Sequence, residues 1–531
     1  MRRIRFDLPF CETQKTGYQK CVMYIFLLSP LANDSHRGRR QRDKFMPLPY
    51  RCTYGRKWPH VKPTLDAQQD HNQRELPTNR GYGSNFKTVL NIIIKDLQPL
   101  SSVKRQSSLD VQLSASCIRN ELQNLYKHKR VEVQKAVNDA SNLALSAELW
   151  SSSEKVFYLT VSCHLISEDW NLKSYVLDTA HLLTKHTAEN AVEHLLRISN
   201  EWNITEKTQI VVTNIDGIKK AQKTGCRWTY IPCFAHTLDR VFRETIQRTD
   251  CESLLRKCQR IVAFFHQSDK ASQHLQQYCA SLNLSQSELT QSCGLNWLTT
   301  LHMLKNILEQ WQAIFKVFVD RRVEDLCLSE NERKIMENIV AVLNILKDVT
   351  KEIGSHGFSP ISKIIPHVQK LQEMLRNNWM ARNDIAKILA EICDYHIGNI
   401  KKNLWFRVST ALDPRYKTSV LQDSDIEDIT AEIRKQIRGS AEHCSHDTES
   451  EESVFQKYWK ITNISGNTLE FWKSHKEFKK LVTVARKHLT VVSTAIPVER
   501  VHQLQESQLV DRRNCLEPEN VSMILFLNSN Q

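Results

Sequence analysis

The spacing of hydrophobic residues changes several times along this chain and divides it into units of different predicted structure. Residues 143–250 alternate short apolar runs with one amphipathic segment. Residues 156–166 are rich in β-branched and aromatic side chains, as strands are, whereas apolar residues recur at helical spacing over 188–198. Another short apolar run covers residues 210–213. This order of strand, helix and strand predicts a right-handed crossover in a mixed sheet.

Residues 251–470 are predicted to form a different unit that is almost entirely helical. Apolar side chains recur there every three or four residues, and such stripes are ordinary core faces of helices. We interpret the acidic, serine-rich stretch 423–453 as a loop within this unit. The stripes run through Leu254, Cys258, Ile261 and Phe265, and through Ile335, Ile339, Val342, Leu346 and Val349.

Two more apolar stripes lie close to the end of the chain. A terminal segment this apolar must be buried somewhere, and we expect the first stripe to pack on the chain's own core. The first stripe comprises Leu481, Val484, Ala485, Leu489 and Val492, and the second comprises Val521, Ile524, Leu525 and Phe526.

The beginning of the chain has no sustained helical or strand period. Disorder is therefore the default prediction for residues 1–85. A basic cluster in this region could act as a nuclear import signal, make loose phosphate contacts, or belong to a merely solvated tail. Helical spacing begins at residue 86 and predicts a short helical unit over 86–142. The basic cluster includes Arg37, Arg39, Arg40 and Arg42.

Composition narrows the class of protein. With 531 residues, 41% of them hydrophobic, the chain can bury a large core. Its formal net charge of +14 fits a polyanionic partner or, equally well, a solvated basic surface. The 15 cysteines have no repeating spacing, which indicates a reduced, intracellular protein. The apolar run at 22–32 is too short to span a bilayer, so we predict no membrane segment.

Two phrases near the C-terminus are more specific than any of these patterns. Thr-Ala-Ile-Pro-Val-Glu-Arg-Val occupies residues 494–501, and Arg-Arg-Asn-Cys-Leu-Glu-Pro-Glu-Asn-Val occupies residues 512–521. Leu-Phe-Leu-Asn follows at 525–528. Together they closely resemble the C-terminal dimerisation segment of hAT-family transposases.

Upstream segments resemble the same family, so the resemblance covers about residues 86 to 531. Ala-Glu-Leu-Trp-Ser-Ser at 147–152 and Ile-Val-Val-Thr-Asn-Ile-Asp at 210–216 are similar to two strands of the transposase core. Cys233 and His236 reproduce the family's Cys-x-x-His segment. Domesticated vertebrate members that carry BED-type zinc fingers are the group it resembles most.

The resemblance implies an α/β plus α fold in which a helical insertion interrupts the sheet core. An RNase H-like mixed-sheet core would begin at 143–250, a large helical insertion would interrupt it over 251–470, and residues 471–531 would supply the final core helix and the dimerisation region. Residues 86–142 would be a truncated DNA-binding region. The second terminal stripe, Val521, Ile524, Leu525 and Phe526, would form the surface of a homodimer.

RNase H-like transposases cut DNA with two divalent metal ions that three carboxylates hold. The resemblance places these positions at Glu148, Asn214 and Glu499. Glu148 is one methylene longer than the family's Asp, and Asn214 is a neutral amide. We therefore expect the metal site to be lost and strand cleavage to be absent. Asp216 could substitute only if its strand continued, and Gly217 favours a turn there.

Other positions also depart from the family or are incomplete. Asn296 replaces the Arg that the family keeps beside Trp297. The resemblance makes Trp297 a candidate DNA contact. Cys233 and His236 lack two further ligands at zinc-finger spacing, so we expect them to pack in the core. The cysteines do not have the spacing of a BED finger either, and the chain could be a decayed copy of a longer protein. We expect no cofactor.

These observations support one leading hypothesis and two alternatives. The leading hypothesis is a domesticated, catalytically inactive transposase derivative: a nuclear dimer that binds DNA or chromatin proteins and could regulate transcription. The first alternative is an active transposase or nuclease, which the neutral amide of Asn214 disfavours. The second is a dimerising scaffold without DNA contact, which the absence of a finger and the short helical unit favour.

Overall fold

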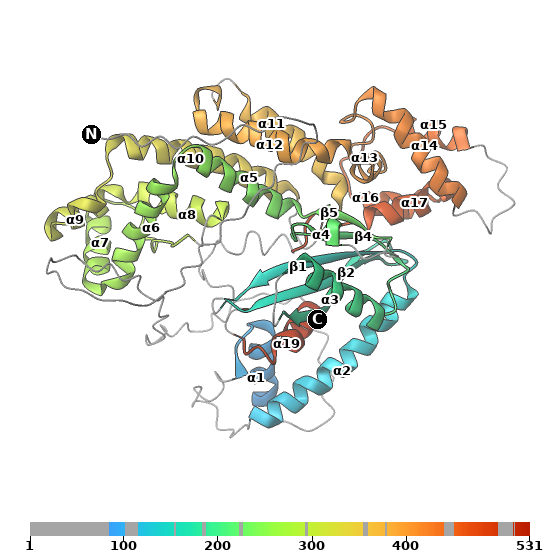
Figure 1. Ribbon diagram of the computed structural model, residues 1–531, viewed down its shortest axis with the longest axis horizontal. Helices are drawn as coiled ribbons and strands as arrows, with labels where there is room; N and C mark the ends of the chain where they lie inside the picture. The colour runs from blue at the N-terminus through green and yellow to red at the C-terminus, as the bar shows by residue number, and fades with distance from the viewer. Residues whose placement is uncertain are drawn as a thin grey trace, which may run out of the picture. The chain divides into compact units, whose positions relative to one another are not determined.

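Five strands form one mixed sheet (Figure 1). The strands run in the order β3-β2-β1-β4-β5; β1 pairs antiparallel with β2 and parallel with β4, so the predicted mixed sheet is confirmed. They are β1 (Leu143–Ser151), β2 (Phe157–Ile166), β3 (Leu172–His181), β4 (Thr208–Thr213) and β5 (Thr229–Pro232). This computed structural model describes residues 84–100, 115–152, 155–182, 187–221, 227–292, 296–353, 359–377, 380–439, 451–496, 513 and 516–531.

The central strand β1 is buried on both of its faces. Leu145 and Ala147 pack in one apolar cluster with α2 (Ala115–Asp139) and α3 (Ala188–Glu201). Ala144 packs in another cluster with α5 (Phe234–Arg248). Neighbouring side chains of a strand point to opposite faces, so a strand covered on both sides is mostly apolar, and its buried polar side chains Ser146 and Glu148 have hydrogen-bonding partners.

Most of the remaining chain is helical, as the spacing predicts. The predicted stripes at 254–265 and 335–349 are buried or, at Ile335, partly buried in one large cluster. In the described residues, no helix is long and apolar enough to cross a membrane. The other elements up to residue 411 are α1 (Ser84–Lys95), α4 (Ile218–Ala221), α6 (Glu252–Gln267), α7 (Asp269–Ser281), α8 (Trp297–Glu309), α9 (Trp311–Arg321), η2 (Glu324–Leu326), α10 (Glu330–Ile353), η3 (Ile361–Lys363), α11 (Ile364–Leu375), η4 (Met380–Arg382), α12 (Asp384–Lys402) and α13 (Leu404–Ala411).

The prediction of a loop over 423–453 is wrong at both of its ends. Residues 423–439 form α14 (Asp423–Gly439), and α15 (Glu451–Lys460) begins before residue 453. Ile429, Ile433 and Ile437 are buried one turn apart and hold α14 on the protein. The acidic residues of its first turn also favour a helix start, because they face the positive end of the helix dipole. The last elements are α16 (Thr468–Ser474), η5 (Lys476–Phe478), α17 (Lys479–Leu489) and α19 (Val521–Ser529).

A buried carboxylate ties together distant segments of the helical unit. Asp413 is fully buried and accepts hydrogen bonds from Ser362 Oγ at 2.7 Å and Thr468 Oγ1 at 2.7 Å. Arg415 Nη2 donates to the same carboxylate at 2.6 Å. Both oxygens therefore have partners, which a buried charge requires.

The two terminal stripes are both buried within the chain. The first stripe, on α17 and just after it, packs on the chain's own core as predicted. The second stripe belongs to α19, which packs along β3 and against α1 and α2 (Figure 1). Its four side chains are buried there, so they do not present an open surface. Their role in a dimer stays a prediction, and it now requires that α19 be exchanged between subunits.

We expect Phe526→Ala to lower the free energy of unfolding by about 3–5 kcal/mol, because it leaves a cavity beside Tyr126 and Trp202. Chemical denaturation measures this loss. The matched control is Phe315→Ala, since Phe315 is exposed on α9 and its truncation should change stability by no more than about 0.5 kcal/mol. Equal losses in the two variants would contradict the packing described for α19.

One buried histidine makes stability depend on pH. His164 on β2 lies 2.9 Å from Ser146 Oγ and 2.8 Å from Ser174 Oγ, and burial lowers its pKa to about 3. Between pH 6.5 and 3 the unfolded chain binds a proton at this residue that the folded chain refuses, so stability falls as pH falls.

We expect His164→Gln to make this acid-induced loss shallower by up to about 1.4 kcal/mol per pH unit in that window. Denaturant titrations at several pH values measure the slope. His128→Gln is the control, because this histidine is exposed on α2. A slope that stays the same in His164→Gln would show that the buried ring does not govern the acid response.

Candidate functional site at the ends of β1 and β4

The parallel pairing of β1 with β4 brings two of the predicted site residues together. Ala147 pairs with Thr213, so Glu148 and Asn214 follow at the same edge of the sheet. Glu499, the third predicted position, and the basic residues Arg37, Arg39, Arg40 and Arg42 lie outside the described residues. The geometry of the site therefore rests on the two strand ends and on what contacts them.

Glu148 is held by an arginine from the far end of the chain. Its carboxylate is 6% exposed and lies 3.1–3.3 Å from the guanidinium nitrogens of Arg513, which is 7% exposed. The guanidinium carbon of Arg513 also lies 4.2 Å from the ring centre of Trp150. Bidentate pairing and stacking both favour a fixed guanidinium. The negative charge of Glu148 is thus neutralised within the protein.

Asn214 uses its amide to join the two strand ends. Leu149 N donates to Asn214 Oδ1 at 2.9 Å, and Asn214 Nδ2 donates to Leu149 O at 2.8 Å. These two bonds fix which end of the amide is oxygen. A carboxylate could make the first bond but not the second, because it has no hydrogen to donate.

A cysteine and a histidine continue from this amide into the core. His236 Nε2 lies 3.1 Å from Asn214 Nδ2, and His236 Nδ1 lies 3.1 Å from Cys233 Sγ. Ala495 N donates to the same sulfur at 3.1 Å. Burial opposes charge on both side chains, but their mutual contact outweighs it, so the pKa of Cys233 is lowered and that of His236 is raised to about 9.

Asn214 acts against the protonation of His236. The orientation of its amide points an N–H towards Nε2, which favours a ring nitrogen that accepts. Cys233 therefore favours the charged imidazolium, whereas Asn214 favours the neutral ring. The Cys-x-x-His pair is part of a hydrogen-bonded chain between β4 and α5, beyond the simple core packing that the sequence predicts.

The remaining predicted site residues are engaged elsewhere. Asp216 is exposed and pairs with Arg240. Asn296 caps α8 by accepting from Thr299 N at 3.0 Å, and its Nδ2 donates to Asp239 Oδ1 at 3.2 Å. Trp297 is only 1% exposed, so its indole cannot stack on a base, and the prediction of a DNA contact needs correction at this residue.

This set of residues does not fit a two-metal site. One carboxylate is paired with Arg513, the second position is an amide already bonded to Leu149, and the alternative Asp216 is paired at the surface. Across the described part of the chain, no group of three or more His, Cys, Asp and Glu side chains could hold a metal ion. We therefore derive no metal-dependent step.

Sequence reasoning missed two residues of the site. Arg513 belongs to the Arg-Arg phrase at 512–513, but the phrase does not say which carboxylate it meets. Asp239 lies one turn after His236 on α5, and burial raises its pKa. That spacing on one helix face was the available signal for Asp239.

Comparisons with known proteins match the same regions. Residues 146–224 match the ZBED1 RNase-like domain, residues 231–342 the ZBED1 RNase-like helical domain, and residues 450–531 the hAT family C-terminal dimerisation region. These assignments agree with the sheet, the helical unit and the terminal segment described above.

Three relatives illustrate the similarity. A human zinc finger BED domain-containing protein 4 is 23% identical over 66% of this chain and 32% of its own length. A putative AC transposase of Zea mays is 19% identical over 62% of this chain and 42% of its own. The Hobo transposase of Drosophila melanogaster is 21% identical over 58% and 45%. The chain thus matches less than half the length of each.

We expect Arg513→Gln to cost about 3–5 kcal/mol of stability, because it leaves the Glu148 carboxylate buried without its cationic partner. The double variant Glu148→Gln, Arg513→Gln should recover part of that loss, since no unpaired charge remains. Denaturation of the two single variants and the double variant measures the coupling. Strictly additive losses would contradict a direct pair.

Proposed function

Because this chain is a hAT-transposase-derived protein related to the BED-type zinc-finger proteins, we propose that it is a nuclear, dimeric protein that associates with DNA or chromatin without cutting DNA. The observation that carries the proposal is the pairing of Glu148 with Arg513. The guanidinium of Arg513 neutralises the Glu148 carboxylate, as a bound divalent metal would in an active transposase. In this proposal the chain retains the transposase-like fold but no longer binds catalytic metal ions.

The second position strengthens the argument against cleavage. A two-metal site needs charged oxygen ligands between its cations, and Asn214 supplies a neutral amide. Its Nδ2–H groups point at Leu149 O and His236 Nε2, so the amide is part of the fold. Loss of charge at one position and its neutralisation at the other act in the same direction.

Two observations support association with DNA: the positive net charge of the chain and its similarity to transposases. The chain carries a formal net charge of +14, which favours polyanions. Two of the relatives are transposases by name, and transposases act on DNA. A nuclear location follows from such a partner, and chromatin proteins are the other class that a DNA-associated dimer would meet.

The match to a dimerisation region supports a homodimer. Since α19 is buried against α1, α2 and β3, exchange of α19 between subunits is one route to that dimer. The same packing favours a second candidate function, a dimerising scaffold without DNA contact. In its support, α1 packs on α19, and α2 packs on both α19 and the sheet, so these helices share a core with the rest of the chain.

We expect the purified protein to bind duplex DNA and yet not to nick or join transposon-end DNA with Mg²⁺ or Mn²⁺. One preparation serves both measurements: a mobility shift in EDTA for binding, and a denaturing gel with added metal for cleavage. Metal-dependent cleavage that disappears in Glu499→Gln would contradict the proposal and favour an active nuclease. Absence of binding even at low salt would favour the scaffold.

A further inference from the structure

Positive charge is concentrated on η5 and the adjoining helices α16 and α17. Over residues 473–487 there are six cationic side chains and one carboxylate, that of Glu477. We call the six the lysine face. They are Lys473, Lys476, Lys479, Lys480, Arg486 and Lys487.

The fold points this charge outward. Leu481, Val484, Ala485 and Leu489 are buried against α13 and α14, so one side of α17 is committed to the core. Lys473, Lys476 and Lys479 are exposed, and Lys480, Arg486 and Lys487 are partly exposed. An amphipathic helix places its polar side opposite the buried stripe.

Among the described residues, three of these lysines have no carboxylate partner. No ion pair with another residue of the described chain forms at Lys473, Lys476 or Lys479. At the other end of the face, Arg486 lies over the ring of Trp170 at 4.6 Å and Lys487 over that of Trp405 at 5.4 Å. Glu168 and Glu432 are the carboxylates whose fields reach these two cations. The rings hold the two cations in place at one end, and the lysines at the other remain available.

We propose that the lysine face is a contact surface for the phosphate backbone of duplex DNA. The inference rests on the proposed association with DNA and names its site. Lys473, Lys476 and Lys479 follow one another every three residues from the end of α16 through η5 to the start of α17, and all three are exposed, so each can neutralise a phosphate. Contacts of this kind carry no base sequence, so they would position the protein without selecting a site.

An acidic protein segment is the competing partner, and the surface argues against it. Protein partners are held mainly by large apolar or aromatic anchors in pockets. The large hydrophobic side chains that are exposed in the described residues are Val131, Phe315, Val319 and Tyr395, and all four lie outside α16, η5 and α17. A face of cations without anchors suits phosphates better.

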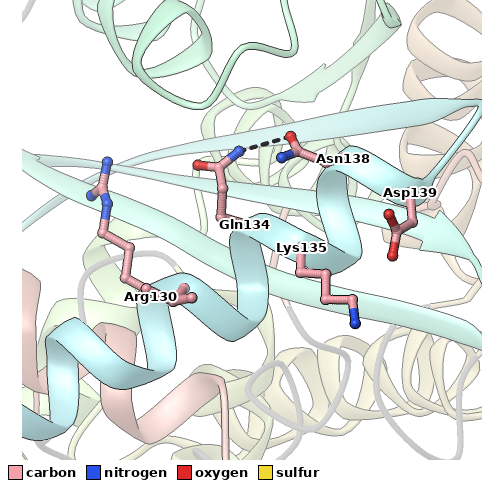
Figure 2. A pocket seen from close by; sticks show the side chains of 6 residues that line it. Arg130, Gln134, Lys135, Asn138 and Asp139 are labelled. Carbon is pink, nitrogen blue, oxygen red and sulfur yellow. Dashed lines mark hydrogen bonds between the residues drawn. The ribbon is translucent and has the colours of Figure 1, made fainter.

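A second polar surface offers a matched control. Along α2, Arg130, Val131, Gln134, Lys135, Asn138 and Asp139 line a shallow hollow of about 420 Å³ (Figure 2). Gln134 Nε2 donates to Asn138 Oδ1 at 3.0 Å across it. Acidic residues are interleaved here, and Lys129 pairs with Glu132 at 3.0 Å. Lysines on α2 therefore carry the same charge in a setting that is already partly neutralised.

The test compares two triple variants of the full chain that change net charge equally. One is Lys473→Gln, Lys476→Gln, Lys479→Gln; the other is Lys127→Gln, Lys129→Gln, Lys135→Gln on α2. Binding to one fixed duplex is measured from 50 to 200 mM salt, and thermal melting confirms that both variants fold. Each lost phosphate contact lowers the log-log salt slope by about 0.9.

We expect the lysine-face variant to lose up to about 2.7 in slope, so that its affinity changes about 40-fold less than that of the wild type over this salt range. The α2 variant should keep the wild-type slope. An equal decrease of the salt slope in the two variants would mean that net charge alone determines DNA binding, and this would overturn the inference.

Other outcomes separate this inference from the proposed function. An unchanged slope in the lysine-face variant, with DNA binding intact, overturns the inference but leaves DNA association standing. Absence of DNA binding by the wild type overturns both. Binding of a polyglutamate peptide that the lysine-face variant loses, with its DNA slope unchanged, would assign the face to an acidic protein partner instead.

Discussion

The structure depends on the return of the C-terminal segment to the sheet. β3 is one of the two edge strands of the sheet, and it contains an extra residue opposite β2, between Val176 and Asp178. Beside this bulge, Asn530 donates to Val176 O at 2.8 Å and accepts from Val176 N at 3.0 Å, which satisfies both backbone groups of Val176 on the edge strand. Ser522 bonds Asp178 at 2.6 Å on the same strand. The last helix therefore closes the edge that would otherwise be free to pair with another chain.

The same segment reaches the candidate site, which couples the site to the fold. Arg513 lies eight residues before α19 and pairs with Glu148, 365 positions earlier in the chain. An arginine in this place holds the end of β1 as a metal would, without needing a ligand from solution. The charge of Glu148 is compensated by Arg513, and this is the physical basis of the proposal that the site no longer binds metal.

How much the sequence predicts depends on how local each interaction is. β2 and β4 are predictable because β-branched, aromatic and apolar composition is a local feature, whereas the strand at β1 was expected only through the family resemblance. The helix over 423–439 was missed because its charged residues outnumber the three isoleucines that bury it, so the hydrophobic signal is diluted. The burial of α19 could not be predicted, since an apolar stripe looks the same whether its partner is α1 of the same chain or a second subunit. Likewise, the motif phrases located Glu148 and Asn214, but no local pattern pairs Glu148 with Arg513.

If the site has lost its metal chemistry as proposed, the hydrogen bonds of Asn214 predict that Asn214→Asp alone would not restore it. An aspartate at this position would lose the donor that reaches Leu149 O and would place two oxygens against each other. It would also accept a hydrogen bond from His236 Nε2. Like the contact with Cys233, this bond would favour the protonated imidazolium. The new carboxylate would thus form an ion pair with the imidazolium of His236, while Glu148 would remain paired with Arg513. Both acids would have cationic partners inside the protein, and neither would be left for a metal.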